Sequence, residues 1–147
     1  MTTSPQPPPS PMNPPMNLVS IRLITDDVAG LAAFYERVTG MEVRFATPDF
    51  AELTTPAATL AIGSTRTVAL FGEGSARAAD NHSAIIEFLV EDVDAEYVRI
   101  KQFNGTFVNE PTTLPWGNRS LLLRDPDGNL VNLFTPVTPA AAAKFAR

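Results

Sequence analysis

The chain has 147 residues, a formal net charge of −5 and 44% apolar residues, which is the composition of one globular domain. Its acidity argues against a nucleic acid partner, and no apolar run approaches the roughly 20 residues needed to cross a bilayer. The lack of cysteine excludes disulfides, zinc–thiolate sites and a thiol nucleophile, and it fits a protein of the reducing cytoplasm.

The first 17 residues, MTTSPQPPPSPMNPPMN, differ most in composition, because they hold seven of the fourteen prolines. They lack the basic start and apolar stretch of a secretory signal. Residues 1–17 are therefore predicted to be a disordered or polyproline-like tail, and a role as a proline-motif ligand stays open. Residues 18–137 are predicted to form a single domain, and the alanine-rich tail 138–147 can form a short helix.

Strand and helix signals begin directly after the N-terminal tail. The segment NLVSIRLIT alternates its side chains as a strand does. In the next segment, DDVAGLAAFYERVTG, apolar residues recur at helical spacing, an aspartate (Asp26 or Asp27) can cap the start, and Gly40 stops the helix. Four strand-like runs follow, separated by proline and glycine signals: MEVRFAT, FAELTT, ATLAIG and TVALF.

The second half of the chain repeats this order. The segment AIIEFLVEDVDAEYVRIKQFNGTFV again has a strand, an Asp-Val helix start, a glycine stop and a strand, displaced by 65 positions (92 − 27). The runs VALF and VNLF close the two halves. Such a repeat predicts an α+β fold of two tandem βαβββ modules, with halves near 18–76 and 83–136. The identical pairs are Asp27 and Asp92, Val28 and Val93, Gly40 and Gly105, and Val43 and Val108.

The stretch LLLRDPDGNLVNLF, residues 121–134, places three oxygen-bearing side chains close together between two apolar runs. Such a cluster is compatible with a metal loop. A calcium loop, however, needs oxygens at fixed alternating positions and a distal bidentate glutamate, which this stretch lacks. Asp127-Gly128 is instead a strong signal for a turn between two strands, so the stretch predicts a hairpin.

Several of these motifs occur together in one known superfamily. The segments DDVAGLAAFYERVTGMEV, VEDVDAEYVRI and PWGNRSLLLRDPDGNLVNLF, in doubled order over about 18–136, resemble the vicinal oxygen chelate superfamily, which includes glyoxalase I, bleomycin-resistance proteins and extradiol dioxygenases. The resemblance implies two modules that form a half-barrel sheet around a pocket, and a homodimer. It is a strong signal for the fold and a weak one for any single reaction, because this fold carries many functions.

Enzymes of this superfamily hold a divalent metal with His and Glu side chains, and the resemblance places their ligands at four positions of this chain. The first-strand position, seven residues before the capping aspartate, is Ser20, and its repeat is Ile85. The last-strand position, three residues after the asparagine of DPDGN, is Asn132, and its counterpart is Ala69. None of the four is a good metal ligand, so the sequence predicts a metal-free member without a cofactor.

His82 is the only histidine, and it lies in the polar connection DNHS. One histidine without a companion cannot make a His/Glu metal site. It is expected to be an exposed loop residue, with a ligand contact or an acid–base role as the alternative. No phosphate-binding glycine motif is present. The serines that lack the context of a nucleophile are Ser20, Ser64, Ser83 and Ser120.

Strand alternation predicts which charged side chains face the pocket. If Leu23 faces the helix, Ser20 and Arg22 face the pocket. The repeat puts Glu87 at the position equivalent to Arg22 (87 − 22 = 65). Inward charges are costly unless they are paired or used. The two side chains therefore form an ion pair or lie at a wet groove edge, or else Arg22 binds a carboxylate or phosphate and Glu87 an amine.

Aromatic and amide side chains complete the predicted ligand site. Trp116, the only tryptophan, lies in a loop flanked by proline and glycine, where it either packs, stacks on a ligand or contacts a second subunit. Asn132 and Phe134 share the pocket face of the last strand, and Asn132 can hydrogen-bond a ligand where a metal would otherwise sit. Phe45 and Phe50 are candidates for an aromatic wall.

The leading interpretation is a glyoxalase- or bleomycin-resistance-like protein that binds a small aromatic, polar or cationic organic molecule without a metal. The alternative is a lyase, isomerase or dioxygenase of the same superfamily that uses a divalent metal or a buried Glu87 as the base. The expected partners are this small molecule and a second copy of the chain, with no nucleic acid and no membrane. The predicted ligand-binding residues are Ser20, Arg22, Glu87, Trp116, Asn132 and Phe134.

Overall fold

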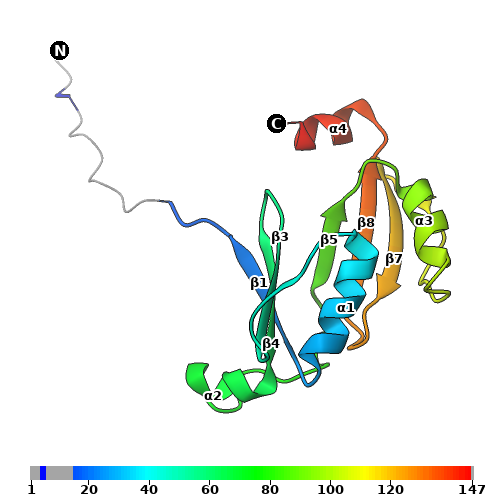
Figure 1. Cartoon of the computed structure of the whole chain (residues 1–147). Helices are drawn as coiled ribbons and strands as arrows, with labels where there is room; N and C mark the ends of the chain where they lie inside the picture. Colours follow the sequence, from blue (N-terminus) through cyan, green and yellow to red (C-terminus); the bar gives the residue numbers. More distant parts are fainter. Residues whose placement is uncertain (1–3, 6–14, 147) are drawn as a thin grey trace.

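The computed structural model describes residues 4–5 and 15–146, and it contains two βαβββ modules in sequence (Figure 1). Most of the predicted N-terminal tail lies outside the described residues. The first module consists of β1 (Ser20–Thr25), α1 (Val28–Thr39), β2 (Arg44–Thr47), β3 (Phe50–Thr54) and β4 (Thr59–Ser64). The second consists of β5 (Ile85–Leu89), α3 (Val93–Lys101), β6 (Thr112–Thr113), β7 (Asn118–Arg124) and β8 (Leu130–Pro136).

Short helical segments lie outside the two modules. A 3-10 turn (Thr65–Thr67) and α2 (Val68–Phe71) follow β4, and α4 (Pro139–Phe145) comes after β8. The last of these confirms the short helix predicted for the alanine-rich tail. No helix in the described part of the chain has the length and hydropathy of a membrane span.

Each module has its own four-stranded sheet, and the two sheets have the same strand pattern. Their orders are β1-β4-β3-β2 and β5-β8-β7-β6. The first strand of each module pairs in parallel with the last, and the other neighbours are antiparallel. β1 and β5 lie at sheet edges, and no ladder joins them in the described residues. The predicted α+β fold of two tandem modules is confirmed, while the two sheets stay separate rather than closing into one half-barrel.

The helix-start signals in the sequence correspond to real caps. The Asp27 side chain accepts a hydrogen bond from the backbone N–H of Gly30 at 3.0 Å. Asp92 accepts in the same way from Ala95 at 3.1 Å. Gly40 ends α1 with a φ of 70°, a left-handed conformation that a residue with a side chain adopts only at a cost. Local capping chemistry therefore sets both helix starts and the end of α1.

Three local predictions are wrong, and one of them is the strand expected at GTFV, where no strand forms. The run TVALF, predicted as a strand, contains the end of the 3-10 turn and α2. The N–H of Arg66 donates to the Ser64 hydroxyl at 3.0 Å, and the Thr67 hydroxyl donates to the Ser64 carbonyl at 2.7 Å. Such side-chain bonds favour a helical turn over a strand. Gly105, predicted to stop the second helix, lies past it, because α3 already ends at Lys101.

The two modules match in strand pairing but not in spacing. Arg22 on β1 pairs with Ala61 on β4, and Glu87 on β5 pairs with Asn132 on β8 in the same way. The first-strand positions differ by 65 (87 − 22), whereas the last-strand positions differ by 71 (132 − 61). The counterpart of Asn132 is therefore Ala61. Ala69, which the sequence comparison assigned to that place, lies in α2 and on no strand.

One hydrophobic core serves both sheets. Figure 1 shows α1 beside strands of both modules. Tyr35 of α1 is fully buried, and the centroids of its ring and that of Phe88 on β5 are 6.4 Å apart. Because each sheet turns one face to this core, the opposite faces point away from it. The shared cluster includes Leu23, Leu53, Leu60 and Ile62 of the first sheet, and Ile86, Leu121, Leu123, Val131 and Leu133 of the second.

A buried hydrogen bond joins α1 to the turn between β7 and β8. The Tyr35 hydroxyl donates to Oδ2 of Asp125 at 2.6 Å. The Asp125 carboxylate also accepts from the backbone N–H groups of Asp127 and Asn129, both at 2.9 Å, and from the Asn129 amide at 2.8 Å. Gly128 has a φ of 83°, which confirms the predicted turn. The DPDGN motif is therefore a hydrogen-bonded anchor, with its buried carboxylate occupied by protein donors.

The Tyr35→Phe variant should lose roughly 1.5–3 kcal/mol of unfolding free energy, the usual worth of a hydrogen bond to a charged group. Burial, and then the Asp125 carboxylate, raise the pKa of the Tyr35 hydroxyl above its usual value of 10.0. The folded protein therefore keeps this proton at pH values where the unfolded chain has lost it. Stability from this group is complete below about pH 10 and falls as the pH rises further, and the variant should lack that loss.

Urea denaturation at neutral and alkaline pH measures both effects. Tyr97→Phe is a matched control, because the Tyr97 ring packs on Phe107 with centroids 4.9 Å apart, while its hydroxyl has no hydrogen-bond partner within the described ranges. Equal losses of stability in the two variants would show that the Tyr35 hydroxyl does not fasten the modules.

Candidate functional site

The candidate site is built on the outer faces of the two sheets, which are the faces turned away from the core. Leu23, the residue after Arg22, is buried in the core. Because side chains alternate along a strand, Ser20 and Arg22 lie on the opposite, outer face of the first sheet. They put Glu87 and Asn132 on the corresponding face of the second sheet. The side-chain facing predicted from strand alternation is therefore found in the structure.

Glu87 and Asn132 contact each other across neighbouring strands. The side-chain amide of Asn132 donates to Oε2 of Glu87 at 2.8 Å. Asn132 is 8% exposed, whereas Glu87 belongs to the exposed residues. The buried amide therefore orients a carboxylate that still reaches solvent.

Three buried polar atoms on this face have no hydrogen-bond partner among the described residues. They are Oδ1 of Asn132, Oγ of Ser120 and, at the start of β7, Oδ1 of Asn118. The first two lie close to Glu87. Ser120 on β7 lies opposite Phe134, and Leu122 lies opposite Asn132, so the two polar side chains are diagonal neighbours. Because buried polar groups are nearly always bonded, these atoms have spare capacity for a ligand or for water.

The C-terminal helix covers one end of the same face. The ring of Phe145 in α4 packs against that of Phe134 in β8, with centroids 5.3 Å apart. Phe134 is only 6% exposed, and Ala141 of α4 is buried as well. Figure 1 shows α4 turning over the end of β8. Phe134, predicted as a ligand contact, therefore lies beneath α4 and forms a wall rather than an open surface.

The outer face of the first sheet carries an arginine that contacts two aromatic rings. The guanidinium carbon of Arg22 lies 4.6 Å from the centroid of the Phe50 ring and 5.1 Å from that of Phe71. Phe50 belongs to this face, because it pairs with Gly63 in register. The ion pair between Arg22 and Glu87 considered from the sequence does not form within the described residues.

The residues on these faces do not fit a divalent metal. Ser20 is exposed at the start of β1, and Ile85 and Ala61 carry no donor atom. Asn132 offers one neutral oxygen, which is a weak ligand by itself. In residues 4–5 and 15–146, no three His, Cys, Asp or Glu side chains are grouped so that they could hold a metal ion. The donor set thus departs from that of the metal enzymes the sequence resembles.

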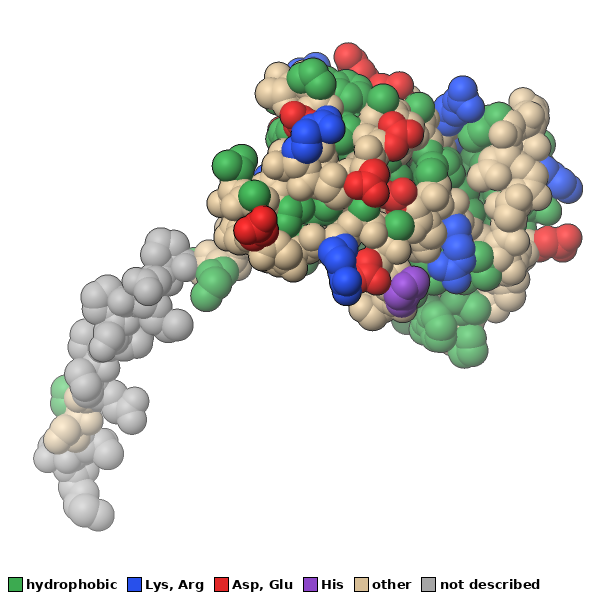
Figure 2. Space-filling view, turned by 90° about the horizontal axis from the view of Figure 1, so that it is seen from below, with side chains coloured by type: hydrophobic (Ala, Val, Ile, Leu, Met, Phe, Trp, Pro, Cys, Tyr) green, Lys and Arg blue, Asp and Glu red, His purple; other side chains and the backbone are tan. Residues whose placement is uncertain are grey.

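Three other residues named from the sequence take no part in the contacts described above. Trp116 is 66% exposed in the turn before β7. His82 is exposed in the loop before β5, as expected, and Figure 2 shows it at the surface beside acidic and basic side chains. Phe45 pairs with Ala51 of the core, so it lies on the side opposite the candidate site.

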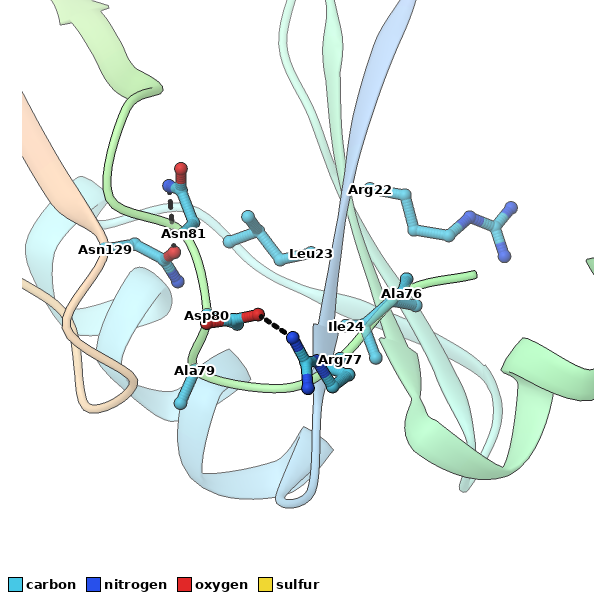
Figure 3. A pocket seen from close by; sticks show the side chains of 9 residues that line it. All are labelled: Arg22, Leu23, Ile24, Ala76, Arg77, Ala79, Asp80, Asn81 and Asn129. Atoms are coloured by element: carbon cyan, nitrogen blue, oxygen red, sulfur yellow. Dashed lines mark hydrogen bonds and ion pairs between the residues drawn. The ribbon is translucent and has the colours of Figure 1, made fainter. Parts of the chain in front are cut away.

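A cavity of about 290 Å³ lies beside the segment that links the two modules (Figure 3). Arg77 pairs with Asp80 there at 3.2 Å, and the Asn81 amide donates to Asn129 at 3.1 Å. Figure 3 shows the Arg22 side chain directed away from Arg77 and Asp80. The charged end of Arg22 therefore makes no contact with this ion pair.

Sequence reasoning missed Ser120 and Phe71 as parts of the outer faces. Counting from the turn could have found Ser120, because hairpin partners are symmetric about the turn, and this places Ser120 opposite Phe134. No comparable signal marks Phe71, because it reaches Arg22 only when α2 folds back beside the sheet.

Comparisons with known proteins identify relatives of the whole folded region. The family model described as Glyoxalase/Bleomycin resistance protein/Dioxygenase superfamily matches residues 17–133. The uncharacterized protein YwbC of Bacillus subtilis (strain 168) is 29% identical over 119 residues, which cover 76% of this chain and 91% of YwbC.

Solved structures are similar over the same region. A glyoxalase/bleomycin resistance protein/dioxygenase from Nocardioides has a TM-score of 0.71 at 18% identity, with 87% of this chain and 88% of that chain covered. A glyoxalase/bleomycin resistance protein/dioxygenase family enzyme from Burkholderia phytofirmans PsJN has a TM-score of 0.71 at 19% identity, with 83% and 100% covered. At these identities, the likeness shows the fold alone.

The Asn132→Asp variant tests the contact between the two strands. It replaces the amide donor with a second carboxylate next to Glu87, and adjacent carboxylates resist ionising together. The unfolding free energy at neutral pH should therefore fall by roughly 1–3 kcal/mol. The repulsion raises the folded pKa of the pair, so this loss should shrink as the pH falls through the usual carboxylate range.

Urea denaturation between neutral and mildly acidic pH provides the measurement. Asn104→Asp is the control, because the Asn104 side-chain oxygen accepts from the N–H of Thr106 and an aspartate can accept in the same way. A loss in Asn132→Asp that does not change with pH would contradict direct contact with Glu87.

Proposed function

Because the chain belongs to the Glyoxalase/Bleomycin resistance protein/Dioxygenase superfamily, we propose that it binds a small, polar and partly aromatic organic molecule without a metal. The binding surface is the outer face of the second sheet around Glu87, Asn132 and Ser120. The residue types at the family's metal positions support a metal-free mode, since Ile85 and Ala61 have no donor atom.

Two buried oxygen atoms without partners, Oδ1 of Asn132 and Oγ of Ser120, support this function most directly. A ligand N–H or O–H group placed over the face would bond to Asn132, and Glu87 would accept from an amine or hydroxyl beside it. Leu122, which pairs with Asn132, would contact the apolar part of the molecule. A largely apolar surface with a few convergent polar atoms is the usual composition of a small-molecule site.

A second copy of the chain is the partner that best fits the uncovered strand edges. β1 and β5 are both edge strands. Val19 next to β1 is 64% exposed, and Ile85 and Leu89 of β5 are 47% and 52% exposed. Unpaired edges with exposed apolar side chains tend to associate. A partner on these edges would also turn each open outer face into a deeper cleft, so the homodimer belongs to the same proposal.

The catalytic alternative gains less support from the residues on this face. A general base would need Glu87 to be buried beside the substrate, but its carboxylate is exposed and is bonded to the Asn132 amide. The buried Ser120 hydroxyl has no hydrogen-bonded base within the described residues. Binding without chemistry therefore accounts for the geometry with fewer requirements.

The Ser120→Ala variant tests the proposed surface. A thermal-unfolding screen of the full chain with aromatic acids, cationic antibiotics and glutathione adducts should find a compound that raises the Tm. Ser120→Ala should fold normally, because the lost hydroxyl has no protein partner. Its affinity for that compound should be roughly three- to tenfold weaker, as expected for one hydrogen bond. Calorimetric titration measures the change.

Ser83→Ala serves as the control, because Ser83 lies exposed in the loop before β5. The proposal fails if Ser120→Ala binds the compound as tightly as the wild type. It also fails if chain soaked with nickel, zinc, iron or manganese retains one ion per chain, and Asn132→Leu abolishes that retention.

The Val19→Lys variant tests the dimer. Light scattering after size-exclusion chromatography should give twice the chain mass of 15.8 kDa for the wild type and one chain mass for the variant. Val98→Lys on α3 is matched to it, since Val98 is 63% exposed and Val19 is 64% exposed. Dissociation by Val98→Lys alone would place the interface on the helices instead of the strand edges.

A further inference from the structure

We propose that Arg22 binds the carboxylate of an aromatic organic acid. This adds the outer face of the first sheet to the binding surface proposed above, names a ligand class for it and rests on that function. The inference comes from the way in which the first sheet holds the Arg22 guanidinium, from the small residues beneath it and from the lack of any acidic partner for it among the described residues.

Two aromatic rings lie within contact distance of the Arg22 guanidinium. Its central carbon lies 4.6 Å from the Phe50 centroid and 5.1 Å from the Phe71 centroid, within the range of cation–π contacts. Phe50 comes from β3 and Phe71 from α2, so two separate elements converge on one side chain. The rings restrict the orientation of the guanidinium, which lowers the entropy that a ligand must overcome to bind it.

Small residues in β4 leave room for the arginine stem on the sheet. A Cβ atom added at Gly63 would lie 3.6 Å from Cδ of Arg22 and 3.5 Å from Cδ1 of Ile24. Ala61, which pairs directly with Arg22, is also small. The 3.6 Å distance is an ordinary contact, so the Arg22 stem lies over Gly63, and its charged end lies near Phe50, the residue paired with Gly63 on the far side.

Arg22 differs from the arginines that carry ion pairs, because the described residues offer it no carboxylate. Figure 3 shows it directed away from the pair formed by Arg77 and Asp80. The chain has 16 acidic and 11 basic side chains, so a carboxylate partner could readily have been supplied. The arginines with such a partner are Arg66 with Asp49, Arg77 with Asp80, Arg99 with Glu96, and Arg119 with Asp94.

The arrangement selects a planar acid rather than any anion. The two rings contact the Arg22 guanidinium without using its N–H donors, and a carboxylate can accept two parallel hydrogen bonds from these. Phe71 is 68% exposed and Leu70 is 87% exposed on the same short helix. These side chains would gain apolar contact from an aromatic group attached to the carboxylate.

Four small probes separate the possible chemistries on the full chain. Benzoate carries the carboxylate, benzamide has the same shape without charge, benzylamine reverses the charge, and phenyl phosphate offers a different anion. Benzoate should shift the NMR signal of the Arg22 Nε–H group and bind about tenfold more tightly than benzamide, because a charged bidentate pair is worth more than neutral hydrogen bonds. Calorimetry gives the affinities.

Substitutions of Arg22 and Phe71 show which of these side chains binds benzoate. Arg22→Gln should abolish benzoate binding, and Arg22→Lys should weaken it about fivefold, because lysine keeps the charge but not the planar fork. Phe71→Leu should weaken it about threefold while the fold is kept, since Phe71 is largely exposed. Arg37→Gln is the control and should bind benzoate as the wild type does, because Arg37 is exposed on α1 with no aromatic bracket.

Each outcome separates this inference from the function on which it rests. Binding of benzamide or benzylamine with shifts of the Asn132 amide but none at Arg22 overturns the carboxylate site and leaves the proposed function intact. Benzoate shifts at Arg22 without change at Asn132 support the site and remove the second sheet from it. Tighter binding of phenyl phosphate than benzoate, or no binding by any probe, overturns the inference.

Discussion

The hydrogen bond from the Tyr35 hydroxyl to Asp125 fastens the helix of the first module to the hairpin turn of the second. The two residues that it joins are 90 positions apart in the chain, and the bond is buried. It therefore forms only when both modules share one core. The turn in its own right is closed by donors from Asn129 and from the backbone. The Asp125 carboxylate therefore both closes the DPDGN turn and joins the two modules, and the shared core depends on it.

Packing of both modules on one core determines which sheet faces carry the polar side chains of the candidate site. Because both sheets turn their apolar faces to the core around α1, their polar alternates are left on the outside. On its outer face, the second sheet carries the hydrogen-bonded pair of Glu87 and Asn132, with the Ser120 hydroxyl unbonded nearby. The first sheet carries Arg22 on its outer face, where the arginine stem lies over Gly63. Neither face is a closed cavity in one chain, which is why the proposed function includes a second copy.

Local signals predicted much of this fold, and distant contacts were beyond them. The Asp27 and Asp92 caps and the turn before β8 depend on a few neighbouring residues, so the sequence located them correctly. The run TVALF has the composition of a strand, but hydrogen bonds at Ser64 turn the chain into a helix instead. A repeat identifies equivalent positions and not neighbouring ones, so Arg22 and Glu87 were equivalent without being paired.

The outer faces of the two sheets carry different side chains at the equivalent positions Arg22 and Glu87. In a duplicated fold, one position of each module can supply the same kind of metal donor. Here the equivalent first-strand positions hold a cation and an anion, and their paired positions hold Ala61 and Asn132. A pair of sites with opposite charge suits a ligand that is itself polarised, with an acidic group for one face and a hydrogen-bond donor for the other. Of the four metal positions, only Asn132 also belongs to the proposed contacts, so the change that removes a metal donor there leaves an amide that already bonds to Glu87.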